Sequence, residues 1–156
     1  MLKFLTFTFV FLFFNIGFGC SCIGKGKLKT AIKKSDVILT GKILNKNIFI
    51  VKFDESGDYE GLNISYTEYS VLITKKLKGQ IISDTIRVVT GVGKGDCGYN
   101  FLVGSNYIIY GVYAEKYIEN GEKVDRFLST GICSKTKLYN LKEEKKVNRI
   151  VRRLRL

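Results

Sequence analysis

Four cysteines constrain the fold of this chain more than any other feature, because two of them are separated by a single residue. They are Cys20, Cys22, Cys97 and Cys133, and all of them follow an apolar leader. An even number of cysteines after an export leader favours two disulfides. A Cys20–Cys22 bond would close a tiny, strained ring, so each is expected to bond to one of the two distant cysteines. Such a bond closes a loop of roughly 75 to 115 residues and stabilises the fold by about 4 to 5 kcal/mol.

Zinc binding by the cysteines is the weaker alternative. The pattern is Cys-x-Cys followed by two isolated cysteines. Structural zinc sites commonly use paired C-x-x-C spacing, which is absent. The residues alone therefore favour a disulfide framework and leave two connectivities open.

Residues 1–19 have the layout of a secretory signal peptide. A lysine precedes an apolar run over Phe4–Phe14, and Gly17 and Gly19 supply small residues before a cut at Cys20. The run is shorter than the about 20 residues of a membrane span, so an uncleaved anchor is the less favoured alternative. Glycine before cysteine also resembles a bacterial lipoprotein signal. We therefore expect a secreted, extracellular protein, with lipid anchoring at the cell surface through Cys20 as the alternative.

Charge and composition narrow the classes of function. The formal net charge is +12, and +11 without the leader, in which Lys3 is the only charged residue. A charge of this sign favours contact with anionic polymers or an anionic membrane surface, although solubility alone also explains it. No basic cluster with interleaved aromatics is found, so no specific nucleic-acid partner is expected. The chain has no histidine, which excludes a histidine-based catalytic dyad and a histidine-ligated zinc. With no recognisable carboxylate pair either, we expect a non-enzyme without a cofactor.

The hydrophobic pattern predicts one domain over residues 20–156. The expected class is mainly β: a five- to six-stranded OB-like closed barrel with a short N-terminal helix and a C-terminal helix. The polar residues 45–47 are interpreted as a tight connection between the first two strands. Helices are expected over 25–36 and 140–156, and strands over 36–44, 47–53, 64–79, 84–90, 106–115 and 125–130.

Two segments allow a functional and a structural interpretation. The glycine-rich stretch 91–98 lacks P-loop spacing and precedes no helix, so it is interpreted as a turn rather than a phosphate site. The C-terminal helix carries Val147, Ile150, Val151 and Leu154 on one face and many cations elsewhere. It is expected to pack on the barrel. Binding to an anionic membrane or to a partner is the alternative.

An ordered set of segments resembles the tissue inhibitors of metalloproteinases and, more broadly, the netrin-like module. "CSC" begins the expected mature chain, and "YTEYSVLITKKLKG" resembles the strand of that family that ends in a Lys-Gly turn. "DTIRVVT" and "GDCGYNFLVGSNYIIYG" resemble its next strand, its Cys-Gly loop and its tyrosine-rich strand. "RFLSTGICSKTKLYNL" resembles the segment with the last cysteine of the inhibitory half. The resemblance covers most of residues 20–141.

The resemblance implies a fold, a pairing and a mechanism. The implied disulfides are Cys20–Cys97 and Cys22–Cys133. In this family, the free α-amine and the carbonyl of the first mature cysteine, here Cys20, chelate the catalytic zinc of the target protease. The implied inhibitory wedge consists of Cys20, Ser21, Cys22, Lys94, Gly95 and Asp96.

Two differences from the family pattern stand out. Ile23 replaces the proline that usually follows Cys-x-Cys, and the short connection expected at 45–47 leaves no room for a contact loop there. Netrin-like modules also serve as general binding domains. We expect a monomeric inhibitor of zinc metalloproteases, with a netrin-like cell-surface module for a polyanion or a protein partner as the alternative.

Overall fold

The computed structural model describes residues 22, 26–52, 63–93, 95–114, 117–119, 122–124 and 127–156. The leader at residues 1–19 lies outside the described residues. In chain order, the elements are α2 (Leu28–Lys34), β1 (Val37–Lys52), β2 (Asn63–Lys78), β3 (Thr85–Gly91), β4 (Asn106–Ala114), β5 (Tyr117–Glu119), β6 (Glu122–Val124), β7 (Phe127–Ser129), β8 (Lys137–Leu138) and α3 (Leu141–Leu154).

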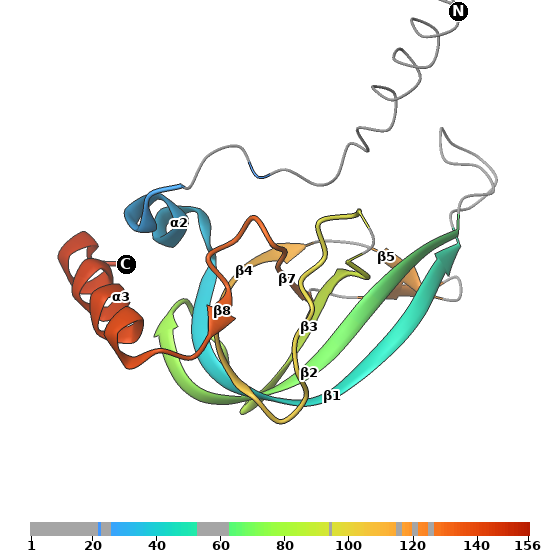
Figure 1. The fold of residues 1–156 in the computed structure, drawn as a ribbon, viewed down its shortest axis with the longest axis horizontal. Coiled ribbons are helices and arrows are strands. Elements are labelled where there is room, and N and C mark those ends of the chain that lie inside the picture. Colours follow the sequence, from blue (N-terminus) through green and yellow to red (C-terminus); the bar gives the residue numbers. More distant parts are fainter. Residues whose placement is uncertain are drawn as a thin grey trace, which may run out of the picture.

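One sheet closes on itself into a ring of five strands. Its order is β1-β2-β3-β7-β4, β1 also pairs with β4, and β8 adds to the free side of β4. The β3–β7 pair is parallel and the other pairs are antiparallel. A separate hairpin is formed by β5 and β6. The expected mainly β fold, with an OB-like ring and two flanking helices, is confirmed (Figure 1).

Successive side chains of a strand point to opposite faces of the sheet, which explains why one hydrophobic core lies inside the ring and another lies between the ring and the helices. Along β1, Val37 and Leu39 point into the ring, whereas Ile38 points out toward the helices. Along β4, Ile109 points inward between two residues that face the helices. Both strands are therefore buried on both faces at this end. The interior core consists of Val37, Leu39, Ile43, Tyr69, Val71, Val88, Phe101, Tyr107, Ile109 and Leu128.

The two helices cover the outer face of this end of the ring and lie side by side in Figure 1. Ile32 of α2 and Val147 and Val151 of α3 pack in one cluster with outward-facing strand residues. The C-terminal end of α2 is bound by Lys78, whose Nζ donates to Ile32 O at 2.8 Å and to Ser35 O at 2.5 Å. This cation meets carbonyls that have no partner within the helix, and it complements the helix dipole.

The predicted connection at residues 45–47 is wrong, because these residues lie inside β1. They pair with β2 after a bulge at Ile43/Asn45, and Asn45 Oδ1 accepts a hydrogen bond from Ser70 N at 3.3 Å. Residues 45–47 are polar because they are exposed, as are their neighbours Leu44 and Ile48. The β1–β2 connection instead spans residues 53–62, which lie outside the described residues. The connection between the first two strands is therefore longer than the three residues expected.

No helix among the described residues is long and apolar enough to cross a membrane.

Candidate functional site

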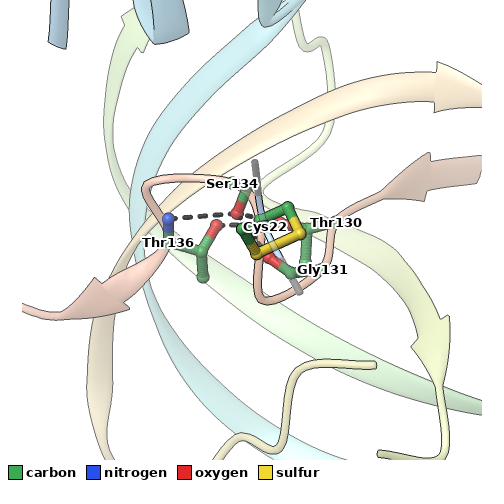
Figure 2. Close-up of a disulfide and its surroundings, with 6 residues drawn as sticks. Cys22, Thr130, Gly131, Ser134 and Thr136 are labelled. Atoms are coloured by element: carbon green, nitrogen blue, oxygen red, sulfur yellow. Dashed lines mark hydrogen bonds between the residues drawn. A yellow bond between two sulfur atoms is a disulfide. The ribbon is translucent and has the colours of Figure 1, made fainter. Parts of the chain in front are cut away.

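The turn that carries Cys133 is organised by a cluster of hydroxyl groups. Thr130 Oγ1 lies 2.9 Å from Ser134 Oγ and 2.8 Å from Thr136 Oγ1, and it donates to Tyr110 O at 2.9 Å. Ser134 Oγ donates to Gly131 O at 2.8 Å, which closes the turn. Figure 2 shows these side chains gathered beside the disulfide. Tyr110 N donates to Thr136 Oγ1 at 3.0 Å, so the cluster also attaches the turn to β4.

A disulfide joins Cys22 to this turn, and this is the second pairing that the family resemblance implies. The two Cα atoms are 5.2 Å apart, although the residues are separated by 111 positions in the sequence. Cys133 lies two residues after Gly131, within the hydrogen-bonded turn. Cys22, which precedes α2 in the sequence, is therefore attached covalently to the turn that follows β7.

The loop that carries Cys97 is organised by a carboxylate. Asp96 accepts hydrogen bonds from the backbone N–H groups of Val92 at 2.7 Å, Gly93 at 2.8 Å and Gly98 at 3.1 Å. Partial burial acts to raise the pKa of Asp96, but the three N–H donors outweigh it and hold the pKa below its usual value. The loop therefore folds around its own ionised carboxylate. This confirms the interpretation of the glycine-rich stretch as a turn.

The Cys97 loop and the Cys133 turn contact each other directly. Ile132 N donates to Cys97 O at 3.0 Å. A Cβ on Gly131 would lie 2.7 Å from the same carbonyl oxygen, so only glycine permits this approach. Cys97 has a φ of 60°, in the left-handed region, and its sulfur is disulfide-bonded. The two cysteine-bearing loops thus form one hydrogen-bonded platform, defined here as the described residues 91–93, 95–98 and 130–136.

The predicted site residues fall into two groups. Cys20, Ser21 and Lys94 lie outside the described residues, and so does the implied Cys20–Cys97 bond. Cys22, Gly95, Asp96, Cys97 and Cys133 all lie on or against the platform.

The structure assigns different surroundings to the two described loop residues of the predicted wedge. Gly95 is exposed, with a φ of +96° and no atom within 4 Å of an ideal Cβ. Asp96 directs its carboxylate into its own loop. Asp96 is therefore a positioning residue for the loop, although both residues are exposed to solvent.

The sequence analysis missed the hydroxyl cluster. The one sequence feature that points to this cluster is the density of Ser and Thr around Cys133 in "STGICSKT". The backbone atoms of Tyr110 on β4 that complete it are far away in the sequence. It also missed a cleft of about 490 Å³ between α2 and the platform. Among the described residues, its lining includes Ala31, Lys34, Ser35, Thr90, Val112 and Lys135.

The described residues hold no cluster of three or more metal-ligating side chains. Chemically, the site supplies backbone groups, hydroxyls and disulfides that can hold an N-terminal segment in place. No family model matches this chain, and no curated protein matches it.

Proposed function

We propose that this protein is an exported inhibitor of zinc metalloproteases. The α-amine and the carbonyl of Cys20 bind the catalytic zinc of the target protease in trans. The observation that carries the proposal is the platform, which fixes Cys22 through Cys133 and brings Cys97 beside it. The chain then begins two residues before a covalent attachment point, provided that the leader is cleaved before Cys20.

The coordination chemistry of such a contact is straightforward. A catalytic zinc has three protein ligands and an open position that holds water or substrate. A neutral α-amine and the carbonyl oxygen of the same residue can close a five-membered chelate ring with the metal. Occupying that position displaces the water that would attack the substrate. The chain therefore inhibits without a metal or a catalytic group of its own.

The disulfides supply the preorganisation that such a contact needs. A free N-terminal segment would lose conformational freedom when it entered an active site, and that loss weakens binding. The Cys22–Cys133 bond already restricts this segment before the protease arrives. The hydrogen bond between Ile132 N and Cys97 O keeps the two attachment points adjacent. Gly95 and the neighbouring loop backbone would contact the rim of the protease cleft.

The decisive experiment compares two proteins that differ only at the first residue. One begins with a free amine at Cys20, and the other carries one additional alanine before Cys20. Both are refolded with intact disulfides and assayed against a panel of zinc metalloproteases. We expect the protein with the free amine to inhibit at least one of them. The alanine extension should weaken that inhibition at least tenfold, which corresponds to about 1.4 kcal/mol.

Equal thermal unfolding midpoints for the two proteins would show that the fold is not the cause of the difference. Equal inhibition by both would contradict the zinc-chelating mechanism. A folded, disulfide-bonded protein with a free Cys20 amine that inhibits no member of the panel would contradict the inhibitor proposal itself. An acylated Cys20 in protein from the native host would exclude the mechanism in the cell, because an acylated amine is a poor zinc ligand.

A further inference from the structure

The solvent-facing side of α3 is a continuous stripe of cations. At about 100° per residue, its six cationic side chains fall within an arc of about 120°. The buried residues Val147 and Val151 lie on the opposite side of the helix. The stripe runs for about 16 Å along the helix axis. It consists of Lys142, Lys145, Lys146, Arg149, Arg152 and Arg153, all of them exposed.

The acidic residues of α3 are turned toward the ring, and of the stripe only Lys145 lies near enough to one of them, Glu144, to help lower the pKa of its carboxyl. Glu144 is buried, and its carboxylate accepts from Lys75 Nζ at 2.5 Å and from the Tyr139 hydroxyl at 2.9 Å. Glu143 accepts from the Tyr110 hydroxyl at 3.0 Å and lies 2.9 Å from Lys137 Nζ. No ion pair is found between a stripe cation and any acid in the described part of the chain.

The short helix α2 brings more cations to the same end of the molecule. Ile32 packs in the same cluster as Val147 and Val151, so the two helices are neighbours (Figure 1). Four lysines of α2 and its N-cap are exposed, and neither the helix nor its flanking residues 26–35 contain an acid. These lysines are Lys27, Lys29, Lys33 and Lys34. Together with the stripe they form what we call the cationic helix surface.

We propose that the cationic helix surface binds a linear anionic polysaccharide, with sulfate or carboxylate groups spaced along the chain. A charged rod of this kind can contact the stripe along its length and release its counterions. The surface is separate from the platform in the sequence, and this proposal does not rest on protease inhibition.

Two other anionic partners fit this surface less well. Membrane binding by a surface helix depends on inserted apolar side chains as well as on charge, and the apolar face of α3 is already buried against the ring. Binding to single-stranded nucleic acid relies on aromatic side chains that stack on bases, and neither α2 nor α3 contains one. A linear polyanion that is recognised by its charge alone fits the cationic helix surface better than either of these partners.

The test measures the affinity of the disulfide-bonded chain for heparin, a sulfated linear polysaccharide, as a function of salt concentration. The helix variant carries Arg149→Gln, Arg152→Gln and Arg153→Gln. Its slope of log affinity against log salt should fall by about 2, because each neutralised contact contributes about 0.7 for a single-stranded polyanion. Its affinity at physiological salt should fall at least tenfold, or about 1.4 kcal/mol.

A control variant carries Lys42→Gln, Lys46→Gln and Lys76→Gln, which removes the same net charge from exposed strand positions. Its affinity should stay within about twofold of the original, because none of these three lysines belongs to the cationic helix surface. Equal losses in both variants would overturn the proposal, because net charge and not the helix surface would then govern binding. Absence of salt-dependent binding to heparin would also overturn it.

Tighter binding to duplex DNA or to vesicles of anionic phospholipid than to heparin, at the same salt concentration, would assign the surface to another partner and overturn the choice made here. Protease inhibition by the helix variant should equal that of the parent protein. The failure of this proposal is therefore distinguishable from the failure of the proposed function.

Discussion

Removing the Cys22–Cys133 disulfide should cost a large part of the stability of this domain. The bond spans 111 positions in the sequence. A loop of that length gives an entropy term of about 16 cal/mol/K in the chain-entropy model, or about 4.8 kcal/mol at 25 °C. Domains of this size unfold with about 5 to 15 kcal/mol, so the loss is a large fraction of the total. The variant Cys22→Ser with Cys133→Ser leaves no unpaired thiol from this pair.

The structure gives a reason to expect a loss near the entropic value. The turn around Cys133 has its own hydrogen bonds through Ser134 Oγ and Ser134 N to Gly131 O, so it should persist without the bond. The folded state then loses little beyond the covalent link, and the main effect lies in the unfolded chain.

The assay is equilibrium unfolding in urea, followed by far-ultraviolet circular dichroism because the chain has no tryptophan. With an m-value of about 2 kcal/mol per M, the midpoint should fall by roughly 2 M. Removing Cys20 and Cys97, the other pair that the family resemblance implies, is the matched control. Loop length enters only as a logarithm, so the two losses should be similar. A loss below about 1 kcal/mol with an unchanged m-value would refute the entropic reasoning, because measured disulfide removals in small secreted domains cost about 2 to 5 kcal/mol.

Three further predictions concern the platform, the acidic side chains and the ring. Thr136→Val should destabilise the domain by about 1 to 3 kcal/mol in the same urea assay, because Tyr110 N loses its buried acceptor. The pKa values of Asp96 and Glu144 are both lowered in the folded state, so their contribution to stability is present above pH about 4 and is lost as the pH falls through their folded values. The double variant Asp96→Asn with Glu144→Gln should therefore show a smaller fall in unfolding free energy between about pH 4 and pH 2. An equal fall in the variant and the parent protein would contradict the assignment of this pH dependence to the two carboxylates. Gly111→Ala should cost about 1 to 3 kcal/mol by thermal unfolding, because its Cβ would lie 2.4 Å from Leu128 Cγ and overpack the core.

Much of the fold could be predicted, because in most elements the hydrophobic pattern of the sequence agrees with the burial of the side chains in the structure. The apolar run "NYIIYGVYA" predicts a buried strand, and β4 is buried on both faces over residues 107–111. The apolar stripe of α3 predicts its contact with the ring, and Val147 and Val151 are buried there. The pattern misled at residues 45–47, where exposure rather than a turn makes the strand polar. A bulged, exposed strand segment that is still paired with its neighbour looks like a connection when only composition is available.

The candidate site was harder to predict, because its organising contacts join residues that are distant in the sequence. Asp96 was interpreted as part of a contact wedge, whereas its carboxylate holds three N–H groups of its own loop. The hydroxyl cluster depends on Tyr110 of β4, which lies 20 residues before Thr130. Which strand a turn packs against is a property of the ring order, and no local motif encodes it.

The spacing of the two N-terminal cysteines has a geometric consequence for the proposed function. A chain end attached at one point can still rotate about that attachment. Attachment at two points one residue apart would fix its direction as well as its position. Cys22 supplies one attachment, to the turn at Cys133. Cys97 presents a disulfide-bonded sulfur on a loop whose carbonyl is hydrogen-bonded to that turn. If Cys20 occupies the second position, as proposed, Ser21 is the only residue between the attachments, and the α-amine has one direction in which to meet a metal.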